Sequence, residues 1–493
     1  MSHFCHAEPV EACRDIKHLH SPFDGLRVTV VTFYEFIKNS HCRKYYSCVF
    51  IAIMKRNLTS SLNDWKASAN RKPLILKGAR QVGKTHILKD FGRSAFPRFH
   101  YVNFEEDEKL GRIFEQDLKP TRILEELQFY LNQSIDRSQD LVIFDEIQRC
   151  PKALTSLKYF SEEMPELALC AAGSLLGVTL NMESFPVGKV QFLNLYPLSF
   201  DEFLAGVEKV RLAELIRNHD QAQPLPEMAH GQLWDLWKRY LIVGGLPEAV
   251  NLYREKQENL YEAVRAIRKM QRDLLDAYLT DMAKHCGKAN ALHIERLWRN
   301  VPAQLAKTQN GSAGKFKLRE GIPGIRGYDR LSAPLDWLES ADLLIRVPII
   351  DTAGIPLSGY VRENRFKLYF FDVGLLGAMS GIAPTTFLNY DFGSYQGYVA
   401  ENFVAQELRA AGDRALYCWQ GRMSEVEFLL EREGGIVPVE VKSGWVTQSK
   451  SLKVYADRYR PSQMYILSAK NVSHSNSLHY LPLYLAAHLK NGE

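Results

Sequence analysis

Residues 78–85 carry glycine, lysine and threonine at a spacing that suits the binding of a triphosphate. They run Gly78-Ala79-Arg80-Gln81-Val82-Gly83-Lys84-Thr85, with two glycines five apart followed by Lys and Thr, which is the phosphate-binding loop pattern. Backbone N–H groups in such a loop, and the N-terminus of the helix that follows, bind phosphate oxygens. We expect Lys84 to neutralise the β- and γ-phosphates of ATP and the Thr85 hydroxyl to ligate Mg²⁺. The predicted nucleotide site extends from Gly78 to His86, and its predicted cofactors are ATP and Mg²⁺.

Two acidic residues, Asp145 and Glu146, follow the apolar run 141–144, which predicts a buried strand of a parallel sheet. The carboxyl end of such a strand lies at the sheet edge where ligands bind. We expect Asp145 to hold Mg²⁺ through water and Glu146 to act as the general base that polarises the attacking water. Ser174 follows the next predicted strand. It either contacts the γ-phosphate or the attacking water, or forms a simple strand-to-loop turn.

A second group of charged residues lies near the C-terminus. Glu427 is on a predicted strand over 425–430. Glu440 and Lys442 project from one face of the next strand, because side chains alternate along a strand. With Glu401 on a preceding helix, they predict a metal-dependent phosphodiesterase site in which carboxylates hold Mg²⁺ and the lysine orients or activates water. The alternative is an ion-paired hairpin, in which Lys442 contacts a glutamate directly and no divalent metal is needed.

The elements that must position these residues form two α/β units, over 54–205 and 381–493. In the first unit, strand-like and helix-like segments alternate, which is typical of a parallel sheet. Its predicted strands are 73–77, 99–104, 141–145, 168–173 and 190–194. Ser199 and Glu202 then predict a capping box at the start of a new helix. Residues 206–290 are mostly helical and form a predicted lid or linker.

Residues 291–380 predict a winged-helix-like segment that ends in a strand over 343–350. Its predicted helical stretches are 297–305 and 333–338. Residues 251–330 hold 16 Lys and Arg against 9 Asp and Glu, a balance of +7 that exceeds the +5 of the whole chain. This balance suits contact with the DNA backbone. The alternative is a solvated loop with a helical spacer.

The whole chain has the composition of a globular protein, with 493 residues, 46% of them hydrophobic and 24% charged. No apolar run approaches the 18 or so residues that a membrane-spanning helix needs, so we expect no membrane partner. The eight cysteines are scattered and predict reduced thiols in the cytoplasm.

Residues 1–53 differ from the rest, because they hold four of the eight cysteines and show little helical periodicity. They are interpreted as a zinc site, as a disordered tail, or as a stretch upstream of a natural start at Met54. We favour the start at Met54.

The chain resembles a bacterial and archaeal family that joins an AAA-type ATPase domain to a C-terminal domain of unknown function called DUF4143. The resemblance covers residues 54–493, with the DUF4143 region at about 220–445. It rests on the phosphate loop and on five further motifs: Phe144-Asp-Glu-Ile-Gln148, Leu195-Tyr-Pro-Leu-Ser-Phe200, Gly244-Gly-Leu-Pro-Glu248, Phe366-Lys-Leu-Tyr369 with Asp372-Val-Gly-Leu-Leu376, and Pro438-Val-Glu-Val-Lys-Ser443.

This resemblance implies ATP binding and hydrolysis, and a C-terminal fold similar to restriction-endonuclease-like nucleases. Lys189 stands where related sequences often have an arginine that acts as a finger, and lysine lacks the planar bidentate geometry of arginine. Glu427 stands where the nuclease-like pattern prefers Asp. The departure at Lys189 argues against fast hydrolysis driven by a neighbouring subunit. The departure at Glu427 argues against assigning cleavage activity from the resemblance alone.

Three functional hypotheses remain at this point. The first is an ATPase whose nucleotide state moves a C-terminal domain that binds or cleaves DNA. The second is an ATP-dependent switch or scaffold for a protein partner, with an inactive nuclease-like fold. The third is a DNA-binding regulator that senses ATP. An oligomer is compatible with each of them.

Overall fold

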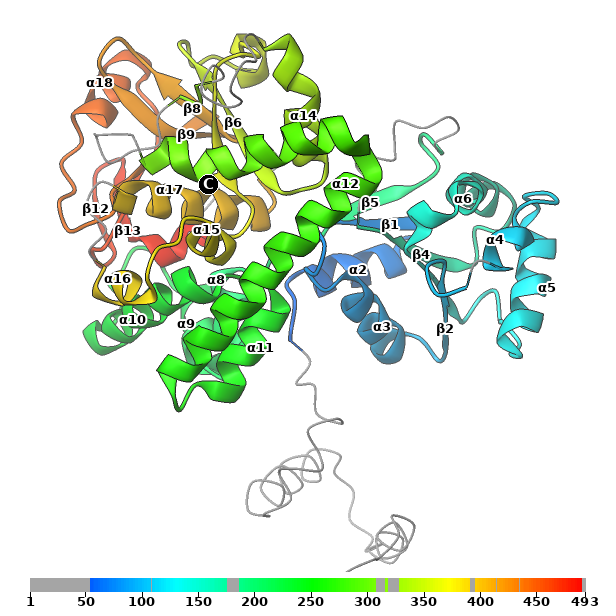
Figure 1. The fold of residues 1–493 in the computed structure, drawn as a ribbon. Helices are drawn as coiled ribbons and strands as arrows, with labels where there is room; N and C mark the ends of the chain where they lie inside the picture. Colours follow the sequence, from blue (N-terminus) through cyan, green and yellow to red (C-terminus); the bar gives the residue numbers. More distant parts are fainter. Residues whose placement is uncertain are drawn as a thin grey trace, which may run out of the picture. The chain divides into compact units, whose positions relative to one another are not determined.

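The computed structural model describes residues 54–107, 109–174, 186–306, 315–317, 328–390, 395–413, 415–433 and 435–489. The chain divides into two compact units, Met1–Ile53 and Met54–Glu493. The first unit, and with it every interpretation of residues 1–53, lies outside the described residues. The second unit contains two β-sheets, each covered by helices (Figure 1).

The first sheet has five strands in the order β2-β3-β4-β1-β5, and every neighbouring pair is parallel. The strands are β1 (Leu74–Lys77), β2 (Phe99–Asn103), β3 (Leu141–Asp145), β4 (Ala168–Ala172) and β5 (Gln191–Asn194). All five predicted strands are confirmed to within one residue at each end. The parallel α/β architecture predicted for this part of the chain is therefore confirmed.

Apolar side chains on both faces explain why the central strands are continuous hydrophobic runs. In β1, Leu74 and Leu76 belong to one core cluster and Ile75 belongs to another. In β3, Ile143 and Val142 divide between the same two clusters. Because successive side chains point to opposite faces, a strand covered by helices on both sides needs apolar residues at every position.

The helices that accompany the first sheet either precede β1, as α2 does, or connect its parallel strands. They are α2 (Leu58–Ala67), α3 (Lys84–Ala95), α4 (Lys109–Ile113), α5 (Pro120–Leu131) and α6 (Pro151–Glu163). Helix α3 follows the phosphate loop directly and packs against β2, β3 and β4. This packing places the start of α3 at the carboxyl edge of the sheet.

A helical segment follows, as predicted for residues 206–290. It contains α8 (Phe200–Gly206), α9 (Val210–Arg217), α10 (Glu227–Val243), α11 (Pro247–Lys256), α12 (Leu260–Ala306) and α14 (Asp329–Ser340). The 47-residue helix α12 (Figure 1) carries an apolar stripe on one face: Ile267, Leu274 and Tyr278 are buried, and Leu260 and Val264 are half-buried.

The second sheet is mixed and has eight strands in the order β12-β13-β11-β10-β9-β8-β6-β7. The strands are β6 (Leu344–Ile350), β7 (Phe366–Phe370), β8 (Tyr417–Gln420), β9 (Glu425–Arg432), β10 (Gly435–Val441), β11 (Met464–Ser468), β12 (Ser473–Ser475) and β13 (Leu478–Pro482). Its helices are α15 (Val373–Met379), α16 (Pro384–Asn389), α17 (Tyr395–Ala410) and α18 (Lys450–Tyr459). Helix α17 packs against β7 and β10, so residues far apart in sequence meet beneath it (Figure 1).

The strand predicted for the wing is β6, and its pairing differs from that of a free hairpin. It pairs with β7 in antiparallel fashion and with β8 in parallel fashion. The predicted wing is therefore part of the eight-stranded sheet, which joins strands assigned to 291–380 with strands assigned to 381–493. The local hydrophobic pattern identifies the strand, but it does not specify the distant partner. Most of residues 309–330, the last part of the basic stretch 251–330, lies outside the described residues.

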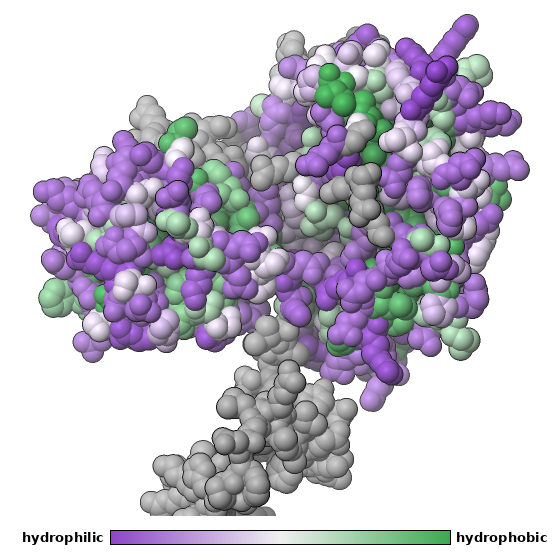
Figure 2. All heavy atoms as spheres, turned by 180° about the vertical axis from the view of Figure 1, so that it is seen from behind, coloured by the Kyte–Doolittle hydropathy of each residue, from purple (hydrophilic) through white to green (hydrophobic). Residues whose placement is uncertain are grey.

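The described surface is mainly hydrophilic on the face drawn in Figure 2, where apolar areas are small and separated by polar ones. Small, scattered apolar areas are ordinary for a protein surface and by themselves indicate no partner. None of the described helices combines the length and apolar character that crossing a bilayer requires.

Candidate functional site

The phosphate loop connects β1 to α3 and has a backbone that requires glycine. Gly78 has a φ of 147°, and a Cβ atom there would lie 2.2 Å from the carbonyl oxygen of Leu195. Gly83, the residue before α3, has a φ of 98°. Both values favour residues without a Cβ. Gln81 also lies in the left-handed region, with a φ of 62°. Such strained positions gather at ligand-binding loops.

The side chains of the loop divide into buried anchors and accessible groups. Ala79 and Val82 are buried in the apolar core and fix the loop against the sheet. Lys84 is also buried, and its Nζ donates hydrogen bonds to the carbonyl oxygens of Gly78 at 2.8 Å and Ala79 at 2.7 Å. Burial lowers the pKa of Lys84 to about 8, although the nearby Glu146 and Asp145 carboxylates oppose the shift. The lysine is thus held inside the loop by carbonyls, where phosphates would favour its charged form.

Asp145 lies at the end of β3 beside the start of α3. The hydroxyl of Thr85 donates to Asp145 Oδ2 at 2.6 Å, and the hydroxyl of Tyr101 donates to the same oxygen at 2.8 Å. The structure therefore brings together the two residues predicted as Mg²⁺ ligands. A hydroxyl and a carboxylate at this edge fit Mg²⁺, which prefers oxygen ligands and keeps several waters.

Tyr101 is a site residue that the motifs do not reveal. Burial, followed by the Asp145 charge, raises the pKa of its hydroxyl, so it stays a hydrogen-bond donor at neutral pH. The signal that could have found it is the strand order, because β2 neighbours β3 in parallel register, with Tyr101 opposite Ile143 and Asn103 opposite Asp145.

Glu146 lies with two polar side chains next to the predicted Mg²⁺ ligands. Its Oε2 accepts hydrogen bonds from Gln148 Nε2 and from Ser174 Oγ, the latter at 3.4 Å. Gln148 Nε2 also lies 3.4 Å from Ser174 Oγ. Ser174 is therefore next to the predicted general base, as expected of a residue that contacts the attacking water. Gln148 belongs to the motif at the end of β3, but no role was predicted for it from the sequence.

Two other predicted site residues, His86 and Lys189, form ion pairs with residues outside the phosphate loop. His86 is paired with Asp90 one turn along α3, at 3.0 Å. Lys189 is 42% exposed and forms an ion pair with Glu162 at 2.9 Å. It precedes β5, at the amino edge of the sheet, whereas the phosphate loop follows the carboxyl end of β1. Lys189 is therefore at the wrong edge of the sheet to contact the nucleotide of its own chain. It could contact only the nucleotide bound to a neighbouring copy.

The C-terminal carboxylates lie on the hairpin of β9 and β10. The pairing of Val439 with Phe428 places Glu440 opposite Glu427, as the in-register hairpin predicts. Glu427 Oε2 accepts a hydrogen bond from the backbone N–H of Val441 at 3.0 Å. Burial, followed by the charges of Glu440 and Glu401, raises the pKa of Glu427 well above its ordinary value.

Lys442 donates to Glu440 Oε1 at 2.6 Å, which is the contact expected of the ion-paired hairpin. Glu401 has different partners on β7, because Lys367 Nζ lies 3.4 Å and the Tyr369 hydroxyl 2.7 Å from its Oε2. Lys367 also pairs with Glu425 at 2.7 Å. The alternation of β7 places Lys367 and Tyr369 on one face, which is the sequence signal that could have identified them.

The fit of a metal to this C-terminal cluster is limited to two carboxylates. Across the described ranges, no group of three or more His, Cys, Asp or Glu side chains is arranged to hold a metal ion. Glu401, Glu427 and Glu440 are therefore not assembled as one three-carboxylate site. However, Glu440 Oε2 is buried and has no hydrogen-bond partner, which leaves one oxygen available to a ligand.

Comparisons with known proteins match three successive parts of the chain. Residues 70–204 match a family described as an AAA domain. Residues 235–386 match a domain of unknown function, DUF8612, and residues 396–485 match a second one, DUF4143. The chain joins an AAA domain to a DUF4143 domain. No curated protein matches the chain.

Solved structures are similar to the chain at low identity. The Walker-type ATPase PABY2304 of Pyrococcus abyssi is 15% identical with a TM-score of 0.42, over 65% of this chain and 94% of that one. The RuvB Holliday junction branch migration motor of Thermotoga maritima is 16% identical with a TM-score of 0.30, over 59% and 89%. Both TM-scores are below 0.5, so neither similarity bears on the fold or the role of this chain.

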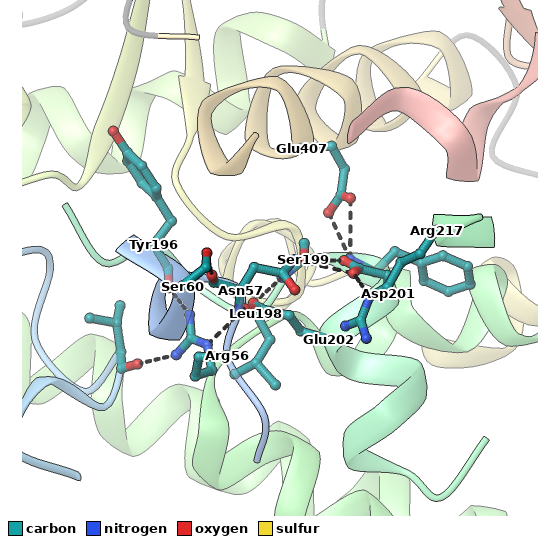
Figure 3. Close-up of polar contacts among 12 residues, drawn as sticks. Arg56, Asn57, Ser60, Tyr196, Leu198, Ser199, Asp201, Glu202, Arg217 and Glu407 are labelled. Atoms are coloured by element: carbon teal, nitrogen blue, oxygen red, sulfur yellow. Dashed lines mark hydrogen bonds and ion pairs between the residues drawn. The ribbon is translucent and has the colours of Figure 1, made fainter. Parts of the chain in front are cut away.

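Arg56 joins the phosphate loop of the AAA domain to the segment that follows β5 (Figure 3). It is 8% exposed, and it donates to Val82 O at 3.0 Å, Tyr196 O at 2.6 Å and Glu202 Oε1 at 3.2 Å. Glu202 completes the predicted capping box with Ser199 at the start of α8. Arg56 gave no sequence signal, because its partners lie 26 to 146 residues away.

The same network extends to the DUF4143 domain (Figure 3). Glu407 of α17 accepts hydrogen bonds from the backbone N–H of Phe200, at 3.0 and 3.2 Å to its two oxygens. Burial and the neighbouring Asp201 charge raise the pKa of Glu407 well above its ordinary value. A single buried polar network thus runs from the phosphate loop through α8 to α17.

We predict that Arg56→Ala lowers the free energy of unfolding by about 3 to 5 kcal/mol, because it removes the cation from a buried ion pair with Glu202. Denaturation in urea measures this change. The matched control is Arg93→Ala, which removes an exposed arginine paired with Asp90 and is expected to cost less than about 1 kcal/mol. Equal losses in the two variants would contradict the assigned role of Arg56.

Proposed function

We propose that this chain binds ATP with Mg²⁺ at the phosphate loop, hydrolyses it, and transmits the nucleotide state to the DUF4143 domain. The observation that carries the proposal is the 2.6 Å contact between Thr85 and Asp145 beside the buried Lys84. A loop that forms a phosphate cradle, with a hydroxyl and a carboxylate at its mouth, suits a nucleotide whose phosphates are bridged by a cation. Purified protein that releases no phosphate from ATP in the presence of Mg²⁺ would refute hydrolysis.

The residues of the site have distinct roles in this proposal. Backbone N–H groups from Gly78 to Thr85 bind phosphate oxygens, and the Lys84 ammonium neutralises charge on the terminal phosphates. Thr85 and Asp145 would hold Mg²⁺, which when bound would neutralise negative charge on the phosphates. Glu146 takes the proton of the attacking water, and Gln148 and Ser174 hold its carboxylate in position.

Helix α12 is the second route by which we propose that the nucleotide state reaches the rest of the chain. The Tyr278 hydroxyl donates to the carbonyl oxygen of Arg80 at 2.8 Å, and Asp281 Oδ2 lies 3.1 Å from Arg80 Nε. Both contacts are made to a residue inside the phosphate loop. A shift of the loop on ATP binding would therefore change the position of α12 as well as that of the Arg56 network.

A second candidate function is cleavage of phosphodiesters at Glu427 and Glu440. The observation that favours it is the unpartnered, buried Glu440 Oε2 opposite a carboxyl whose pKa is raised. A divalent cation between the two groups would offset both costs, because Mg²⁺ needs few protein ligands. If this site is inactive, the chain is an ATP-dependent switch or scaffold for a protein partner.

Calorimetric titration of nucleotide-free protein with Mn²⁺ separates these two candidates. The cleavage proposal predicts one Mn²⁺ bound per chain and at least tenfold weaker binding in Glu440→Gln, with cleavage of single-stranded, duplex or branched DNA in the wild type. The control is Glu433→Gln, which changes an exposed carboxylate on the same hairpin. Wild-type protein without Mn²⁺ binding or cleavage would leave the switch as the function of this domain.

The proposal also includes the binding partners of the chain. We infer that DNA or a protein partner binds the C-terminal half, and that the protein acts in the cytoplasm. The three described free cysteines, Cys150, Cys170 and Cys418, are buried, which agrees with reduced thiols. An oligomer would allow Lys189 of one copy to approach the nucleotide of the next.

A further inference from the structure

A cavity of about 970 Å³ lies between the first turns of α12 and helix α16, and none of its lining residues belongs to the phosphate loop or the carboxylate hairpin. Its apolar lining includes Leu260, Val264 and Leu388. The volume is within the range of small-molecule sites, which are mostly apolar with a few placed polar groups. The cavity therefore has the size and lining of a binding site.

Four cationic side chains of α12 line this cavity: Arg265, Arg268, Lys269 and Arg272. Their spacing of three, four and seven residues places them along one face of the helix. Asp273 is the acidic residue in the lining. Over the described part of the chain, no carboxylate lies within ion-pair distance of these four cations. The cavity thus combines apolar walls with an edge of net positive charge.

Arg268 is the buried member of this set, with 7% exposure. Its Nη1 donates to Gln271 Oε1 at 2.6 Å and to Gly374 O at 2.8 Å, while Nε and Nη2 have no hydrogen-bond partner. Burial lowers the pKa of Arg268 to about 10, and the charge of Asp372 opposes this shift. A buried donor without an acceptor lowers the stability of the protein. An anionic ligand would supply the missing acceptor.

We propose that this cavity binds a small organic anion with an apolar body, such as an alkyl phosphate or carboxylate. Its head group would be bound by Arg268 and by the exposed Arg265 and Arg272, and its body would pack on the apolar walls. Inorganic phosphate lacks the body that Leu260, Val264 and Leu388 would cover.

Calorimetric titration of the full-length, nucleotide-free protein with octyl phosphate below its micelle concentration tests the proposal. We expect one molecule bound per chain. Octyl glucoside, which has the same chain without the charge, and inorganic phosphate, which has the charge without the chain, should each bind at least tenfold more weakly. If either probe matches octyl phosphate, the cavity is only an apolar groove or only a charged surface, and the proposal fails.

Charge removal at the rim provides the matched variants. The double variant Arg265→Gln and Arg272→Gln should weaken octyl phosphate binding at least tenfold. The double variant Lys209→Gln and Arg211→Gln, which removes two exposed cations near α9, should leave it unchanged. Equal loss in both variants would contradict the proposal. Because no nucleotide is present, failure here would leave the proposed ATPase untouched.

Two further arms identify other occupants. Displacement of octyl phosphate by a twelve-residue oligo-dT, lost in the Arg265 and Arg272 variant, would make the cavity a nucleic-acid site and overturn the proposal. Co-sedimentation with vesicles that contain phosphatidylglycerol, without binding of monomeric octyl phosphate, would make it a membrane contact and would also overturn it.

Discussion

Lys84→Ala is expected to weaken ATP binding by at least about 100-fold. The lysine donates two hydrogen bonds to loop carbonyls in the free protein and would donate to phosphates in the complex. A hydrogen bond to a charged group contributes about 1.5 to 3 kcal/mol, so the loss of two amounts to roughly 3 kcal/mol or more. This corresponds to a factor of roughly 100 in the dissociation constant. Titration with a fluorescent ATP analogue measures it.

The lowered pKa of Lys84 gives the same prediction a pH dependence. Phosphates favour the charged amine, so binding above pH 8 must take up a proton. Affinity should be constant below pH 8 and fall by up to about tenfold per pH unit above it. In the free protein the native state holds fewer protons than the unfolded state between about pH 8 and 10.5, so the cost of burying the charged Lys84 is relieved and the free energy of unfolding rises across that window.

The exposed lysine Lys55 provides the control for these measurements. Lys55→Ala removes a lysine with no part in the loop, and should change neither the affinity for ATP nor its pH dependence. A Lys84→Ala protein that binds ATP within threefold of the wild type would refute the assignment of the nucleotide site.

The sequence predicted the phosphate loop well because all its parts are contiguous. Glycines at 78 and 83, a strand before them and a helix after them specify one backbone path, and the structure has that path. The strands were equally predictable, since burial on both faces leaves the same apolar run wherever a strand lies in the sheet. Tyr101 and Arg56 were not predictable in this way, because their roles depend on which strand or segment becomes a neighbour.

The C-terminal cluster shows the same limit. The short hairpin fixed the pairing of Glu427 with Glu440, because the register follows from the turn. Lys367 comes from a strand about 60 residues earlier, and its approach to Glu401 depends on how α17 packs against β7. The sequence therefore predicted one metal site for the three glutamates. In the structure, Glu401 instead contacts Lys367 and Tyr369 on β7.

Glu146→Gln is expected to slow ATP hydrolysis by about 10² to 10⁴, which is the usual contribution of a general base. The amide keeps the size of the side chain and can still accept hydrogen bonds from Gln148 and Ser174. It cannot take the proton of the attacking water. ATP binding should therefore remain within about threefold of the wild type, because Lys84, Thr85 and Asp145 are unchanged.

Phosphate release and nucleotide binding measured on the same preparation separate the base from the residues around it. Ser174→Ala removes a 3.4 Å contact to Glu146 but leaves the carboxylate, so it should slow hydrolysis far less than Glu146→Gln. A larger loss in Ser174→Ala would make Ser174 the main group that positions the water. A Glu146→Gln protein that hydrolyses ATP at the wild-type rate would show that another group activates the water, and the role assigned to the residue after β3 would be wrong.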